Sequence, residues 1–194
     1  DNGQIVRSLP FTHASHRLSW NDDGTRVVLG TAHQQKASRW LGNQSLVIDV
    51  NSGKTLLKLP GESGVYTPDG KHLLYVLGAG EVEEQRLSRK IIIICDALTG
   101  KEIRRLTGHI DRILDVIITA DSKRVISVDR KAIAVWNINT GMQLMTLPCP
   151  EVNQLLGKLA TGPDGRSLAY QGYYGTTVWS TGKITEPSQE EESR

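Results

Sequence analysis

Short apolar runs of strand length follow one another along this chain, and each is bounded by residues that favour turns. One set of turns contains Asp-Gly or Asp-Ser, at positions 23–24, 69–70, 121–122 and 164–165. A second set contains Ser-Gly or Thr-Gly, at positions 52–53, 99–100, 140–141 and 181–182. An Asp-Gly pair between two apolar runs is a strong hairpin signal, and no helical spacing of apolar residues is sustained. The pattern therefore predicts an all-β protein built from antiparallel hairpins.

The turns recur at regular intervals, which indicates an internal repeat. Equivalent glycines stand at 3, 53, 100, 141 and 182, so the steps are 50, 47, 41 and 41 residues. The last two steps match the period of about 40–45 residues of a four-stranded propeller blade. We therefore predict a β-propeller or propeller segment over residues 1–184. The predicted blades lie at about 15–60, 61–107, 108–148 and 149–182, and a strand at 4–10 completes the last one.

One unit, residues 106–142, contains Gly-His at 108–109 and Trp-Asn at 136–137. On these residues it resembles a WD40 repeat, and the resemblance extends over nearly the whole chain. The other units keep the turns and strands but lack Gly-His. At the position of the family's Trp-Asp they carry Ile48-Asp49, Cys95-Asp96 and Trp179-Ser180.

The resemblance implies a hydrogen-bond network inside this blade. In the family a His, a Ser or Thr, an Asp and the Trp are buried together, and the matching residues here are His109, Ser127, Asp129 and Trp136. Buried imidazole, indole and carboxylate groups all need hydrogen-bond partners. We therefore interpret His109 as a structural residue rather than a catalytic one.

The number of blades leaves three alternatives open. The strands add up to four sheets, whereas the resemblance implies about seven blades. The chain is then a fragment of a longer propeller, or its ends pair with a second copy, or four blades close a ring. An open arc would expose unpaired strand edges and an apolar flank, and this favours self-association.

Two long loops, at 31–44 and 78–90, lie between the second and third strands of their blades. In the WD40 family such loops share a face with the loops between blades, and that face often binds partners. The candidate partner-binding residues are Lys36, Arg39, Trp40, Glu83, Glu84, Arg86 and Arg89. Trp and Arg are enriched at interface hot spots. Two alternatives remain: Trp40 covers its own blade, and the charged run is a solvated loop.

Composition gives little further direction. The net charge is +2, which is no signal for nucleic acid or membranes. No apolar run approaches the roughly 18 residues of a membrane span, and Cys95 in an apolar run is interpreted as buried. We expect a soluble protein, and a cytoplasmic location is slightly favoured. The acidic tail at 185–194 is predicted to be disordered.

Catalytic and cofactor-binding patterns do not stand out in the sequence. No phosphate-binding loop or nucleophile elbow is present. Asp22 and Asp23 fit hairpin chemistry, and His13 and His16 would need a third ligand to hold a metal. We therefore expect no enzyme activity, cofactor or metal, and a scaffold that binds a protein partner or neighbouring domain. The alternatives are part of an enzymatic or small-molecule-binding propeller, and a regulatory or sensor domain of a larger protein.

Overall fold

The computed structural model describes residues 15–31, 44–78, 89–149 and 157–181. These residues form fifteen β-strands, and none of them lies in a helix. The predicted all-β fold class is therefore confirmed. Within the described ranges there is correspondingly no long apolar helix of the kind that crosses a membrane.

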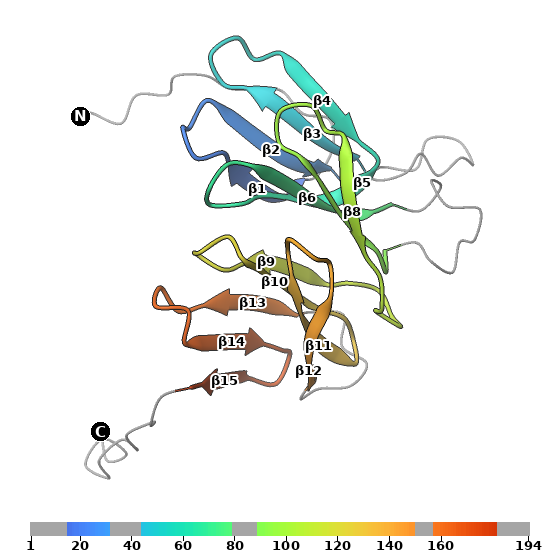
Figure 1. Ribbon diagram of the computed structural model, residues 1–194, viewed down its shortest axis with the longest axis vertical. Helices are drawn as coiled ribbons and strands as arrows, with labels where there is room; N and C mark the ends of the chain where they lie inside the picture. The colour runs from blue at the N-terminus through green and yellow to red at the C-terminus, as the bar shows by residue number, and fades with distance from the viewer. Residues whose placement is uncertain (1–14, 32–43, 79–88, 150–156, 182–194) are drawn as a thin grey trace.

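The strands form four antiparallel sheets, and strands adjacent in the chain are adjacent in the sheet (Figure 1). The first sheet contains β1 (Ser15–Trp20), β2 (Arg26–Thr31), β3 (Gln44–Asp49) and β4 (Thr55–Leu59). The second contains β5 (Gly61–Tyr66), β6 (His72–Leu77), β7 (Ile92–Asp96) and β8 (Glu102–Leu106). The third contains β9 (Asp115–Ile118), β10 (Arg124–Val128), β11 (Ala132–Asn137) and β12 (Gln143–Pro148). The fourth contains β13 (Lys158–Thr161), β14 (Ser167–Gln171) and β15 (Thr176–Ser180).

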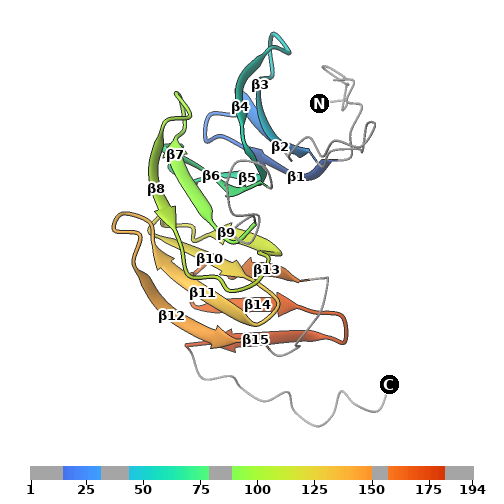
Figure 2. The same cartoon turned by 90° about the vertical axis from the view of Figure 1, so that its right-hand side faces the viewer.

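The sheets follow one another along an arc, with β1–β4 at one end and β13–β15 at the other (Figure 2). The first strands of successive sheets contact each other, β1 with β5, β5 with β9, and β9 with β13. The first strand of each sheet is therefore the innermost one. This is a four-bladed β-propeller arrangement, and it agrees with the period of the sequence repeat.

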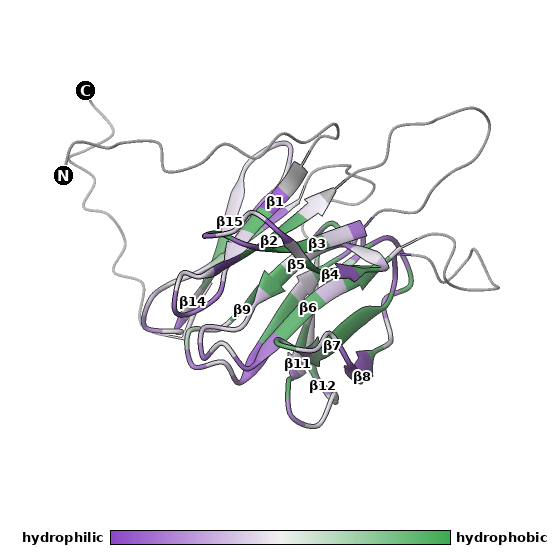
Figure 3. Ribbon diagram, turned by 90° about the horizontal axis from the view of Figure 1, so that it is seen from above, coloured by the Kyte–Doolittle hydropathy of each residue, from purple (hydrophilic) through white to green (hydrophobic). Residues whose placement is uncertain are grey.

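Each interface between successive blades encloses a hydrophobic core. The core between the first and second blades includes Val28, Val47, Leu73 and Ile93. The next core includes Leu74, Ile92, Val116 and Trp136, and the last includes Ile126, Ile133, Leu159 and Tyr170. Side chains alternate between the two faces of a strand, so β6 and β7 each contribute to two cores. This explains why the sequences of β6 and β7 are nearly continuous apolar runs. In Figure 3, β6 and β9 are largely coloured as hydrophobic.

The predicted hairpins are present and have the expected turn chemistry. Positive φ angles of 72°, 67° and 67° occur at Gly24, Gly70 and Gly165. A glycine takes this conformation without the steric cost of a Cβ atom, and in the third blade Ser122 takes it with φ of 57°. There the Asp121 carboxylate accepts hydrogen bonds from Thr119 Oγ1 at 2.6 Å and from the Lys123 backbone N–H at 3.0 Å. Local side-chain bonds of this kind stabilise the turn.

The second blade lies close against the first because β5 contains glycines. A Cβ atom on Gly64 would lie 2.5 Å from Cγ2 of Val28. The hydroxyl of buried Ser45 donates a hydrogen bond to the carbonyl of Gly61 at 2.9 Å across the same interface. The missing side chains therefore allow a close, hydrogen-bonded approach of the two sheets.

The two ends of the arc are incompletely covered. On β1, Leu18 and Trp20 have exposed fractions of 62% and 56%. Their partners in the register with β2 are Leu29 and Val27, so one face of the first blade is apolar. At the other end, among the described residues, β15 pairs only with β14. The strand predicted at 4–10 and the tail predicted at 185–194 lie outside the described residues.

Candidate functional site

His109, Ser127, Asp129 and Trp136 lie together in one buried hydrogen-bond network in the third blade. Trp136 Nε1 donates to Ser127 Oγ at 2.8 Å, and His109 Nε2 lies 2.7 Å from the same oxygen. His109 Nδ1 lies 2.9 Å from Asp129 Oδ2. The indole can only donate and the ionised carboxylate can only accept. A neutral imidazole with its proton on Nδ1 therefore satisfies every group, and the structure brings together the four residues that the resemblance implied.

Asp129 is the electrostatic centre of this network, with an exposed fraction of 1%. Besides the imidazole, its Oδ1 atom accepts hydrogen bonds from the backbone N–H groups of Lys131 at 2.7 Å and Ala132 at 2.8 Å. Burial alone would raise the pKa of Asp129, but the hydrogen bonds from His109, Lys131 and Ala132 outweigh it. They hold the pKa of this carboxyl at about 2.

This lowered pKa makes the stability of the protein depend on acid pH. A carboxyl with a depressed folded-state pKa contributes stability that is present above its unfolded pKa. That contribution is lost as the pH falls from about 4 towards 2, and its size is about 2 kcal/mol. We expect urea unfolding at a series of pH values to show this loss in the parent chain. The Asp129→Asn variant should be less stable at pH 7 and should have a shallower dependence below pH 4. An equal slope in both proteins would contradict this assignment.

The network also fixes two loops that carry charged residues. Asp129 Oδ2 accepts a hydrogen bond from the backbone N–H of Asp111 at 3.3 Å, which ties the loop at 107–114 to the turn at 129–131. The backbone N–H of Ile113 donates to the carbonyl of Arg89 at 2.8 Å, which ties the same loop to the second blade. These segments lie on the face of the propeller that carries the loops between successive blades and the loops between the second and third strands of each blade. We call this face the loop face.

Three arginines lie near one another at this face, since Arg89 and Arg130 both act electrostatically on Arg112, and we call these three residues the arginine cluster. Two of them pair with the buried Glu62 on β5, with Arg89 Nε at 3.2 Å and Arg112 Nη2 at 3.9 Å from its Oε1. Arg130 lies at the tip of the turn that Asp129 stabilises. The Nε atom of Arg130 is buried and has no hydrogen-bond partner among the described residues.

The arginine cluster carries more positive than negative charge. Burial lowers the pKa of the Arg112 guanidinium, and the like charges of Arg89 and Arg130 lower it further, whereas Glu62 acts in the opposite direction. Arg89 and Arg112 thus share one carboxylate, and Arg130 is a third cation close to Arg112. The place is partly exposed, since the side chain of Arg112 is 46% exposed. An arrangement of this kind favours the approach of an anionic group.

Of the candidate partner-binding residues, the structure describes only Arg89, and it places this residue in the arginine cluster. Lys36, Arg39, Trp40, Glu83, Glu84 and Arg86 lie outside the described residues. Sequence reasoning missed Glu62, Arg112 and Arg130. Glu62 interrupts a glycine-rich strand, and an isolated carboxylate at such a position was the available signal. The two arginines stand in short loops whose meeting depends on how the blades pack.

A second charged group lies where the inner strands meet. Asp115 on β9 has an exposed fraction of 4%. Its Oδ1 forms an ion pair with Arg17 on β1 and lies 3.9 Å from Nζ of Lys158 on β13. Its Oδ2 accepts a hydrogen bond from the backbone N–H of Leu159 at 3.0 Å. One carboxylate therefore links the first, third and fourth blades.

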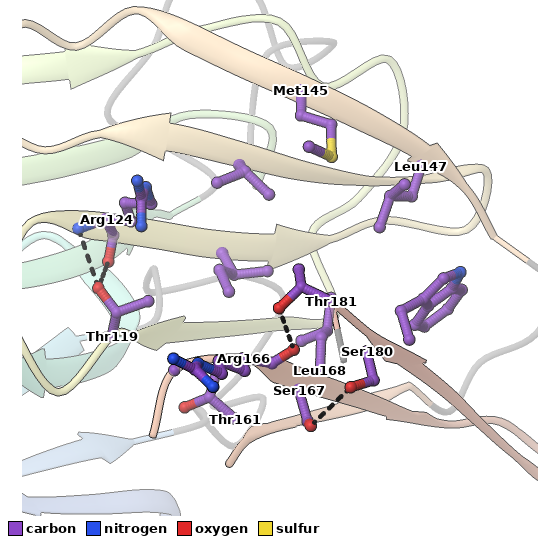
Figure 4. A pocket seen from close by; sticks show the side chains of 14 residues that line it. Thr119, Arg124, Met145, Leu147, Thr161, Arg166, Ser167, Leu168, Ser180 and Thr181 are labelled. Carbon is purple, nitrogen blue, oxygen red and sulfur yellow. Dashed lines mark hydrogen bonds between the residues drawn. The ribbon is translucent and has the colours of Figure 1, made fainter. Parts of the chain in front are cut away.

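A cleft of about 220 Å³ lies between the third and fourth blades (Figure 4). Met145 and Leu147 come from one side, while Leu168, Ser167 and Ser180 come from the other. Pockets for small-molecule ligands usually have volumes of about 300–1,000 Å³. The cleft is therefore small for such a ligand, and it is best described as an incompletely filled part of the interface between the two blades.

In the part of the chain that the structure describes, no three His, Cys, Asp or Glu side chains lie close enough together to hold a metal ion. His13 lies outside this part. Cys95 and Cys149 are both buried and form no disulfide bond with each other, and the burial of Cys95 agrees with the apolar run around it. Burial raises the pKa of Cys95 to about 12, so this thiol is an unreactive core group.

Comparison with known proteins identifies similarity in fold. No family model matches the sequence, and no curated protein matches it. Among solved structures, 1059 chains are similar. One is a chain of hydrazine synthase from Kuenenia stuttgartiensis, with a TM-score of 0.61 and 15% sequence identity, and the match covers 88% of this chain and 44% of that chain. This chain thus spans less than half the length of that neighbour, and what the two share is the β-propeller fold.

Proposed function

We propose that the chain is a non-catalytic interaction module, a WD40-like propeller segment that presents its loop face to another protein or domain. The observation that carries this proposal is the arginine cluster, whose positive charges are held at a partly exposed position by a buried network. Loops on a rigid scaffold are where binding residues concentrate. The cluster also has an apolar neighbour, because Ile110 in the same loop as Arg112 has an exposed fraction of 66%.

A second candidate function is an enzymatic or small-molecule-binding propeller. The buried carboxylate of Asp115 among the inner strands favours it, and the structural neighbour hydrazine synthase is itself an enzyme by name. The interaction module is preferred because Asp115 is already paired with Arg17 and lies near Lys158. A carboxylate whose charge is already balanced by basic side chains is better suited to holding blades together than to proton transfer.

The experiment that tests the loop face uses two exposed positions on opposite faces. Ile110 and Leu98 have nearly equal exposed fractions, 66% and 67%, and Leu98 lies in the hairpin between β7 and β8 at the other face. A photo-cross-linking amino acid at each position is exposed to an extract of the source cells. We expect discrete adducts from position 110 and none from position 98. The captured partner is then purified and titrated against Ile110→Asp and Leu98→Asp.

A charge placed on an apolar contact weakens an interface. Ile110→Asp should therefore reduce the affinity about tenfold, and Leu98→Asp should leave it unchanged. Both variants should unfold at the temperature of the parent chain, because both positions are exposed. Capture through position 98 alone, or equal losses in the two variants, would exclude the loop face as the binding surface.

A further inference from the structure

We propose that the arginine cluster binds a carboxylate-rich segment of a partner protein, whose Asp or Glu side chains pair with Arg112 and Arg130. This inference rests on the loop-face function proposed above and names the chemical class of the partner. A segment of this kind supplies the negative charge that the cluster lacks. It also supplies planar acceptors that match the forked donors of a guanidinium.

The positive charges of the arginine cluster exceed the negative charge that balances them. Arg89 Nε lies 3.2 Å from Glu62 Oε1, which is a close ion pair, whereas Arg112 Nη2 lies 3.9 Å from the same oxygen. Arg89 is therefore the better partner of the one carboxylate, and Arg112 is held at the limit of contact. Arg130 forms no ion pair with a described residue, and its Nε atom is buried without a hydrogen-bond partner there. Donors of two guanidinium groups thus remain for an incoming acceptor.

The donors of Arg112 and Arg130 stand on segments that are held in place before any partner arrives. The loop with Arg112 and the turn with Arg130 are both anchored to the buried Asp129, through the backbone N–H groups of Asp111 and Lys131. The Nζ of Lys90 donates to the carbonyl of Ile110 at 2.8 Å and anchors the same loop from the second blade. A preorganised site loses less conformational entropy on binding.

The surface around the arginine cluster fits an acidic peptide better than a nucleic acid. Proteins that bind nucleic acids contact several successive phosphates with a stripe of Lys and Arg, usually on a strongly basic domain. Here the net charge of the chain is +2, and two of the three arginines in the cluster contact one glutamate. Asp111 stands beside Arg112 and adds negative charge, while exposed Ile110 offers an apolar contact. A short acidic peptide with an apolar side chain matches this mixed surface better than a polyanion.

The test measures binding of a fluorescein-labelled oligoglutamate peptide ending in leucine to the full chain by fluorescence anisotropy. We expect saturable binding that weakens as salt is raised, because the contacts are charged and partly exposed. Arg112→Gln and Arg130→Gln should each weaken binding about fivefold, and the double variant more than about tenfold. Arg166→Gln is the matched control, because it removes a guanidinium from an exposed hairpin at the opposite face.

Four outcomes would overturn the inference. If Arg166→Gln weakened peptide binding as much as Arg112→Gln, the peptide would be attracted by the net charge of the protein alone. Tighter binding of an oligothymidylate than of the peptide, lost in the double variant, would assign the cluster to nucleic acid. Peptide binding that appears only after Glu83→Gln and Glu84→Gln are introduced would show that the chain's own acidic loop occupies the cluster. If the peptide does not bind but position 110 still captures a partner, this inference fails and the loop-face function stands.

Discussion

Replacing Asp115 with alanine is expected to destabilise the protein by about 3–5 kcal/mol. The side chain is buried, forms an ion pair with Arg17 and accepts a hydrogen bond from the backbone of Leu159. Its loss leaves a guanidinium without this carboxylate and a buried N–H group without an acceptor, and both are costly in a low-dielectric interior. Urea unfolding followed by far-UV circular dichroism measures the change.

Lys158→Ala is the matched control for this prediction. Lys158 Nζ lies 3.9 Å from the same carboxylate, but its side chain is 65% exposed. An exposed ion pair of this kind contributes less than about 1 kcal/mol. Hydrogen exchange adds a second readout, since Asp115→Ala should speed exchange of the Leu159 amide while amides of β6 and β7 remain protected. Equal stability losses in the two variants would mean that Asp115 does not hold the blades together.

Ser127→Ala is expected to lower the free energy of unfolding by about 3 kcal/mol, although it removes a single oxygen atom. That oxygen is the shared partner of Trp136 Nε1 and His109 Nε2, and its residue has an exposed fraction of 0%. The substitution leaves two buried polar groups without partners at once. Each such group costs about 1–3 kcal/mol, and a methyl group cannot replace the lost bonds.

The control for Ser127→Ala is Ser167→Ala on β14, where the hydroxyl lies near the surface and contacts Ser180 Oγ at 3.5 Å. This control should change stability by less than about 0.5 kcal/mol. Chemical denaturation followed by tryptophan fluorescence measures both variants. A loss below about 1 kcal/mol in Ser127→Ala would contradict the view that this network is the structural centre of the third blade.

Ser127 and Asp115 act at two levels of the structure. The network around Ser127 holds one blade together and orients its loops, whereas Asp115 holds three blades to one another. If both are correct, Ser127→Ala should also weaken binding at the arginine cluster, because Asp129 anchors the loops that carry Arg112 and Arg130. A path of hydrogen bonds therefore runs from the buried Trp136 through Ser127, His109 and Asp129 to the loop that carries Arg112.

Much of this architecture follows from local sequence. Turn chemistry is local, since an Asp with Gly or Ser following it needs only neighbouring residues to form its bonds, and the hairpins at Gly24, Gly70, Ser122 and Gly165 were predictable for that reason. Strand pattern is local too, because alternation and apolar runs reflect which faces are covered. The period then predicted the propeller, and the resemblance based on the residues at 108–109 and 136–137 implied the four residues of the network.

The charged sites required the packing of the blades. Arg17 and Asp115 are separated by 98 positions in the chain, and Glu62 and Arg112 stand in different repeats. No local pattern relates such residues, because the geometry between repeats arises from the cores between the sheets. The sequence by itself therefore predicts the strands, the turns and the network inside one blade. Only the folded arrangement places the carboxylate of Asp115 between three blades. It also gathers three arginines on one face, because these contacts depend on how whole sheets stack.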